Sequence, residues 1–171
     1  MMRQMTQSLA VAIGITLLSF TPAAAQDRVV RSFTLADIGQ IMEVIGGSMG
    51  EVAPDAQPGE LEVTLTYGDG ETAIFRGINC AAGDVPSARA CTHFALIKAF
   101  ELPSARAASD LSAKFDAAWF ADSAEDRTFT IHRMDWVVNG VTLGHLGAAI
   151  DEFGRGVAVV RNQYLNQTSP D

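Results

Sequence analysis

Apolar residues recur every three or four positions in three parts of the chain, which predicts three amphipathic helices. The first begins at Thr34, a suitable N-cap, and ends at Gly46-Gly47. The second begins near Ser109-Asp110 and ends near Trp119. The third follows Thr142, and its apolar stripe comprises Leu146, Ala149, Ile150, Phe153, Val157 and Val160.

Other segments alternate between apolar and polar residues, which is typical of half-buried strands. Residues 61–67 and 72–79 form such a pair, joined by a turn at Gly68-Asp69-Gly70. Residues 92–102 fit both a strand and a helix, and the strand is preferred. Two further strands are expected at 119–122 and at 127–138, where Asn139-Gly140 predicts a tight turn. Residues 48–59 are expected to form a loop with a short extended piece at 50–52.

The predicted elements follow the order α-β-β-β-α-β-β-α. Consecutive strands favour antiparallel pairing, so the expected fold class is α+β, with an antiparallel sheet of about five strands and three helices. We expect residues 26–165 to form a single domain and residues 166–171 to be a disordered tail.

The N-terminus has the organisation of a secretory signal peptide. Arg3 precedes an apolar run of 12 residues from Leu9 to Phe20, and Ala23-Ala24-Ala25 supplies the small residues of a cleavage site. We therefore expect residues 1–25 to be removed and the protein to be periplasmic or secreted. The alternative, a retained membrane anchor, fits less well because a span needs about 20 apolar residues.

Export changes how the two cysteines are interpreted. Cys80 and Cys91 would meet an oxidising compartment, and their spacing matches neither a zinc motif nor a redox motif. A disulfide between them is the expected arrangement, and two buried free thiols are the alternative.

The charge of the chain excludes some partners. Without residues 1–25 the protein keeps 11 Lys and Arg against 20 Asp and Glu, a net charge of −9. This charge argues against binding to nucleic acid and to anionic membrane surfaces.

No catalytic, metal-binding or cofactor-binding motif is present in the sequence. His93, His132 and His145 lie far apart and have no acidic partner at a recognisable spacing, so none is expected to be a catalytic base or a metal ligand. Tyr67, Trp119 and Trp136 are the side chains most able to anchor a ligand, although packing in the core is the preferred interpretation for them.

The C-terminal half resembles the YbjN family of bacterial proteins. The similarity is carried by residues 134–146 and the apolar helix through Phe153, and residues 33–38 resemble the opening helix of that family. The cysteine-bearing region with Phe94 and Phe100 resembles the family's strand pair, so the similarity covers about residues 32–160. The chain departs from the family at residues 113–116, where an Asn-x-Trp-Asn-like stretch is common, and in a longer loop between the cysteines.

This resemblance implies a fold similar to that of type III secretion chaperones, which often dimerise and bind protein segments. Together with the missing catalytic motifs, it predicts a non-catalytic binding module that recognises a protein or peptide and needs no cofactor. A homodimer is compatible with this prediction. The alternatives are a small-molecule or lipid carrier and an enzyme with a dispersed site.

Overall fold

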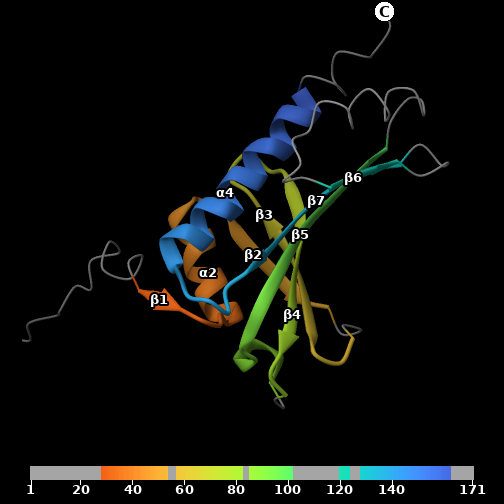
Figure 1. The fold of residues 1–171 in the computed structure, drawn as a ribbon. Coiled ribbons are helices and arrows are strands. Elements are labelled where there is room, and N and C mark those ends of the chain that lie inside the picture. Colours follow the sequence, from red (N-terminus) through yellow and green to blue (C-terminus); the bar gives the residue numbers. More distant parts are fainter. Residues whose placement is uncertain (1–27, 54–56, 83–84, 102–119, 124–127, 163–171) are drawn as a thin grey trace, which may run out of the picture.

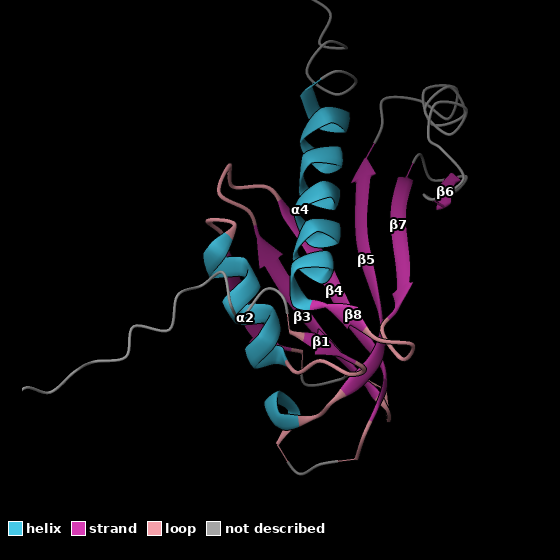
Figure 2. Cartoon of the chain, turned by 60° about the vertical axis from the view of Figure 1, so that its left-hand side comes forward, coloured by secondary structure: helices cyan, strands magenta, loops and turns pink. Residues whose placement is uncertain are grey.

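A computed structural model describes residues 28–53, 57–82, 85–101, 120–123 and 128–162. These residues form a twisted antiparallel sheet with two α-helices packed on one of its faces (Figures 1 and 2). The α+β class and the antiparallel sheet are confirmed. No helix in the described ranges is long and apolar enough to cross a membrane.

The first helix, α2 (Leu35–Val44), begins where the sequence predicted. The Thr34 hydroxyl accepts a hydrogen bond from the Asp37 N–H, and the Asp37 carboxylate accepts one from the Thr34 N–H. This reciprocal capping box satisfies two backbone donors that the first turn cannot pair internally. The helix buries Leu35, Ile38, Ile41 and Met42 against the sheet.

The last helix, α4 (Leu143–Val160), also matches its prediction. Thr142 caps it by accepting a hydrogen bond from the His145 N–H. All six members of the predicted apolar stripe are buried. Near the middle of the helix, the ring of Tyr67 packs on Gly154, and the Tyr67 hydroxyl donates to the Ile150 carbonyl at 3.2 Å.

Six strands form the main sheet in the order β2-β3-β4-β5-β7-β6. Every neighbouring pair is antiparallel, and β4 and β5 occupy the centre. The strands are β2 (Ser48–Val52), β3 (Glu60–Thr66), β4 (Thr72–Cys80), β5 (Cys91–Glu101), β6 (Phe120–Ser123) and β7 (Thr128–Trp136). A short 3-10 helix, η1 (Pro86–Ala88), precedes β5.

Two of these strands change the predicted picture. The segment 92–102, which fitted both helix and strand, is the long central strand β5, because it pairs along most of its length with β4 on one side and β7 on the other. The segment 48–59, expected to be mainly a loop, begins with the five-residue edge strand β2. Its pairing with β3 slips between Met49 and Val52, and this bulge hides the alternation that identifies regular strands.

The residues before α2 pair with two later parts of the chain, β8 and the start of β5. β1 (Val29–Val30) pairs with β8 (Val141–Thr142) in a separate two-stranded sheet. Phe33 exchanges two backbone hydrogen bonds with Cys91, at 3.0 and 2.8 Å. Phe33 is fully buried, with its ring edge-on to Phe75 and Phe94. These two short strands were not predicted, because each is only two residues long.

The expected order of elements is corrected in detail. The sheet has six strands, β1 and β8 form a second pairing, and the described part of the chain contains two α-helices where three were expected in the whole chain. The predicted middle helix between Ser109 and Trp119 lies outside the described residues, as do the predicted signal peptide 1–25 and the predicted tail 166–171.

Candidate functional site

A disulfide joins Cys80 and Cys91, as predicted from the sequence. The two residues are direct cross-strand partners at the end of the β4–β5 pair, and the S–S distance is 2.01 Å. Cys91 is fully buried, and a Cβ atom at Gly77 would lie only 2.8 Å from its sulfur. The bond therefore links β4 covalently to β5 at one end of the sheet, and we assign it a structural role.

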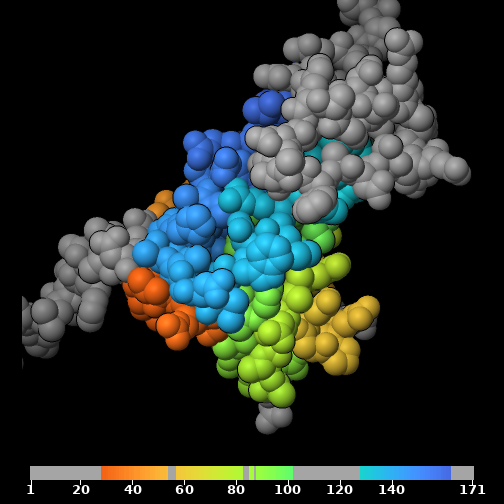
Figure 3. Space-filling view, viewed as in Figure 1, coloured from red at the N-terminus to blue at the C-terminus, as the bar shows by residue number. Residues whose placement is uncertain are grey.

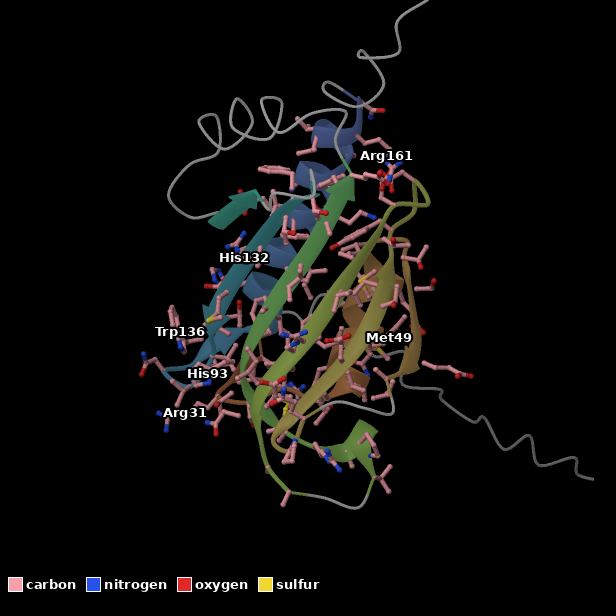
Figure 4. The ribbon with its side chains drawn as sticks, turned by 90° about the vertical axis from the view of Figure 1, so that its right-hand side faces the viewer. Arg31, Met49, His93, His132, Trp136 and Arg161 are labelled. Carbon is pink, nitrogen blue, oxygen red and sulfur yellow. A yellow bond between two sulfur atoms is a disulfide. The ribbon has the colours of Figure 1, made fainter. Side chains whose placement is uncertain are left out.

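The three histidines lie on different parts of the domain. His93 and His132 are on β5 and β7, four residue pairs apart in the sheet register. His145 is exposed in the first turn of α4. Figure 4 shows His132 well above His93 along the sheet. Among the described residues, no three His, Cys, Asp or Glu side chains come together as metal ligands.

The face of the sheet opposite the helices carries apolar side chains in cross-strand rows. The register places Ile74 beside Ile97 and Ile97 beside His132. The next row holds Arg76, Ala95 and Met134, and the row after it holds Ile78, His93 and Trp136. We call this surface the open face, because no described helix or strand packs over it (Figure 4).

Trp136 and Met134 are the most prominent apolar groups of the open face. Trp136 is 57% exposed and Met134 is 46% exposed. The expectation that Trp136 packs in the core is therefore wrong, whereas Tyr67 is buried as expected and Trp119 lies outside the described residues. The period-two pattern could have shown this, because Trp136 has the parity of Met134 and the opposite parity to the buried Phe129 and Ile131.

A short chain of hydrogen bonds holds His93 beside Trp136. The Asn79 amide donates to the Thr92 hydroxyl at 2.9 Å, and the Thr92 oxygen lies 2.8 Å from His93 Nδ1. The imidazole meets the indole of Trp136 edge-on, with ring centroids 6.1 Å apart. The Trp136 indole therefore packs against the His93 ring although it is largely solvent-exposed.

The backbone beside Trp136 forms an open strand edge. The N–H of Val137 donates to the Thr92 carbonyl, so the odd-numbered residues at this end of β7 direct their backbone groups toward β5. The N–H and C=O groups of Met134 and Trp136 therefore point away from β5. β6 pairs with β7 only from Phe129 to His132, and no other described residue pairs with the rest of this edge. We call residues 133–136 on this side the β7 edge.

The opposite edge of the sheet is less suited to accept another strand. The bulge between Met49 and Val52 breaks the regular ladder of β2, and Glu51 places an exposed charge on it. Bulges and charges are common protections of strand edges. The β2 edge is therefore protected against strand addition in a way that the β7 edge is not. Met49 of β2 and Trp136 of β7 lie toward opposite edges of the sheet (Figure 4).

Most charged side chains around the sheet are engaged within the domain. Arg133 bonds to Asp135 at 3.0 Å and to Glu152 of α4 at 2.6 Å. Burial lowers the pKa of the Arg133 guanidinium, but the hydrogen bonds to the two carboxylates outweigh it and raise that pKa overall. Arg133 thus fixes α4 to the covered face of β7 and leaves the open face free of its charge.

A second group of charges lies at the other end of the sheet. Glu71 pairs with Arg161 after α4 and lies 3.8 Å from Lys98, whose ammonium also donates to Thr72 at 3.1 Å. Burial lowers the pKa of Lys98, and Glu71 partly opposes this effect. Glu71, Lys98 and Arg161 all have partners in this group. We therefore assign the group to holding the end of α4 on the sheet, and not to ligand binding.

No family model, curated protein or solved structure matches the chain.

Proposed function

We propose that this protein is an exported, YbjN-like binding module without a catalytic centre, and that it recognises an extended segment of another protein. The segment would add a strand to the β7 edge and place its side chains on Met134 and Trp136. The observation that carries the proposal is that the same residues, Met134 and Trp136, combine exposed apolar side chains with a strand edge that pairs with no described residue.

This combination provides both affinity and selectivity. Added strands gain affinity from backbone hydrogen bonds and specificity from alternate side chains that meet the host sheet. Tryptophan is also the residue type most enriched among the energetic centres of protein interfaces. The residues of β7 are at the surface in Figure 3, where they are coloured cyan.

The periplasm or the extracellular space is the proposed location. The disulfide supports it, because such bonds persist in oxidising compartments. The predicted signal peptide supports it independently, and mass spectrometry of exported protein should find Gln26 at the N-terminus. Recovery of membrane-embedded protein that still begins with Met1 would contradict export.

Two substitutions at Met134 test the strand-addition proposal, using peptides selected from a random library displayed on phage. Met134→Pro removes an outward-facing N–H, which an edge strand tolerates, and should abolish peptide binding while the fold remains. Met134→Ala keeps that donor and should reduce binding only in part.

The matched control is Val159→Ser, which alters an equally exposed apolar residue on α4 (45% exposed) and should leave binding unchanged. Equal binding by Met134→Pro and the wild-type protein would show that the β7 edge does not pair with the peptide. Loss of binding in Val159→Ser would instead indicate an interface on α4.

A further inference from the structure

Asp135 lies between Met134 and Trp136 on β7, and its side chain points to the opposite face of the sheet. Its partner on β5 is Phe94, which is buried in the core. On the other side of β7, no described residue pairs with Asp135. A strand added to the β7 edge would therefore meet Asp135 on the covered face while it meets Met134 and Trp136 on the open face.

The group of charges around Asp135 contains one more negative charge than positive. Arg133 Nε donates to Asp135 Oδ2 at 3.0 Å, and Arg133 Nη1 donates to Glu152 Oε2 of α4 at 2.6 Å. One guanidinium is thus shared by two carboxylates. The second oxygen of each carboxylate bonds to no described residue.

The two carboxylates of this group are also more accessible than its guanidinium. The side chain of Arg133 is 18% exposed, against 31% for Asp135 and 60% for Glu152. The neighbouring Asp151 is balanced by Arg155 at 2.9 Å and does not change the sum of charges. An arriving strand therefore meets a negatively charged surface on the covered face.

The position opposite Asp135 is the one at which the side chains of an added antiparallel strand approach most closely. Met134 and Trp136 direct their N–H and C=O groups outward, so the residues opposite them exchange hydrogen bonds with β7. Asp135 occupies the non-hydrogen-bonded position between them, where facing Cα atoms are only about 4.5 Å apart. Opposite charges stabilise such a cross-strand pair, and like charges destabilise it.

We propose that the segment accepted at the β7 edge carries a lysine or arginine opposite Asp135, an inference that rests on the proposed function. The cation points toward Asp135 and Glu152 on the covered face. In an antiparallel arrangement like that of the other strand pairs, the residue before the cation lies against Trp136 and the residue after it against Met134. The recognised pattern is therefore apolar-basic-apolar.

The sheet itself limits the length of the paired segment. β6 pairs with β7 as far as His132, so an added strand has room beside residues 133–136 only. The three residues of the pattern lie opposite residues 134–136, and one flanking residue lies opposite Arg133. A peptide of five residues is therefore long enough to test the pattern.

The test uses three five-residue peptides, blocked at both ends, and the protein purified with its disulfide intact. The first is Thr-Ile-Lys-Ile-Thr, and the others replace Lys by Gln and by Glu. Binding is followed by nuclear magnetic resonance titration of the Met134 and Trp136 amide signals. The Lys peptide should bind about two- to fivefold more tightly than the Gln peptide, the range of an exposed ion pair, and the Glu peptide more weakly than both. Added salt should reduce these differences.

Two variants of the protein remove the excess negative charge. Asp135→Asn and Glu152→Gln keep the size of each side chain and an oxygen that accepts from Arg133, and each brings the group to zero net charge. Both should largely abolish the preference for the Lys peptide over the Gln peptide. Glu51→Gln makes the same change of net charge on β2, at the opposite edge of the sheet, and should leave the preference intact.

The failures of the two proposals give different results. Equal binding of all three peptides, with shifts at Met134 and Trp136, would overturn the preference for a basic residue and leave strand addition standing. Equal effects of Asp135→Asn and Glu51→Gln would show that only net charge matters, which also overturns the preference. Absence of binding by every peptide would overturn both proposals.

Discussion

At the scale of single residues, the contact between Tyr67 and Gly154 decides how closely α4 approaches the sheet. A Cβ atom at Gly154 would lie 2.4 Å from the Tyr67 ring, whereas a Cβ atom at Gly147 would have its nearest neighbour, in Ile41, at 3.5 Å. The two glycines share one helix and differ mainly in the space around them. Nothing in the sequence pattern distinguishes them, because the partner of Gly154 is 87 positions earlier in the chain.

Gly154→Ala should lower the free energy of unfolding by about 1–3 kcal/mol, because the displaced tyrosine costs more than the helix propensity gained. Gly147→Ala is the control and should raise the free energy of unfolding by about 0.5–1 kcal/mol. Urea denaturation of both variants measures the difference. Stabilisation by both substitutions would show that Tyr67 does not pack closely on α4.

Tyr67 also predicts a dependence of stability on pH. Burial raises the pKa of its phenol above the usual value of 10.0, and the charges of Asp151 and Asp69 raise it further. The neutral phenol therefore stabilises the fold fully below pH 10, and this contribution is lost as the pH rises above that value, because the unfolded state ionises first.

Tyr67→Phe should lower the free energy of unfolding by about 0.5–1.5 kcal/mol at pH 7, through loss of the hydrogen bond to Ile150. The difference from the wild-type protein should shrink above pH 10, where only the wild-type protein has this phenol to ionise on unfolding. Denaturation curves at pH 7 to 11 provide the measurement. A constant difference across that range would show that Tyr67 titrates alike in both states.

At the scale of elements, local signals identified the helices and regular strands, and long-range pairing determined the rest. Thr34 and Thr142 mark helix starts because their partners are three residues away. β2 was expected only as a short extended piece at 50–52, because the bulge in its pairing with β3 interrupts the alternation. The pairing of β1 with β8 joins residues far apart in the chain, so no local pattern showed it. For the candidate site, the parity of Trp136 was available in the sequence, but the open edge depends on how far β6 extends along β7.

The disulfide joins the strands β4 and β5. Replacing both Cys80 and Cys91 by alanine should lower the free energy of unfolding by about 2–3 kcal/mol, mainly because the unfolded chain gains freedom. The single variant Cys80→Ala should lose a similar amount, since the bond is absent there too. Thiol labelling of the unfolded, unreduced wild-type protein should find neither sulfhydryl free, and two labels per chain would contradict the bond.

At the scale of the whole molecule, one face of the sheet is covered and the other carries the proposed site. α2 and α4 bury the apolar side chains of the covered face, and Arg133 and Arg161 fasten α4 through charges. The open face keeps Met134 and Trp136 exposed, next to an edge that no other described strand pairs with at residues 133–136. Stability and the proposed recognition therefore depend on different faces of the same strands.

This separation predicts that stability and binding respond to different substitutions. Phe153→Ala should lower the free energy of unfolding by about 3–5 kcal/mol, because Phe153 is fully buried under the sheet. Trp136→Ser should change stability by about 0.5 kcal/mol or less and yet weaken peptide binding strongly. Thermal melts beside binding titrations compare the two, and a large loss of stability in Trp136→Ser would contradict the separation.

The most direct test of the central claim is hydrogen exchange at single amides of β7. In the free protein, the N–H groups of Met134 and Trp136 should exchange rapidly, while those of Arg133 and Asp135, which face β5, should be protected. Binding of a peptide should slow exchange at Met134 and Trp136 specifically. Protection of these two amides in the free protein would show that the β7 edge is already occupied, and unchanged exchange on binding would show that the partner binds elsewhere.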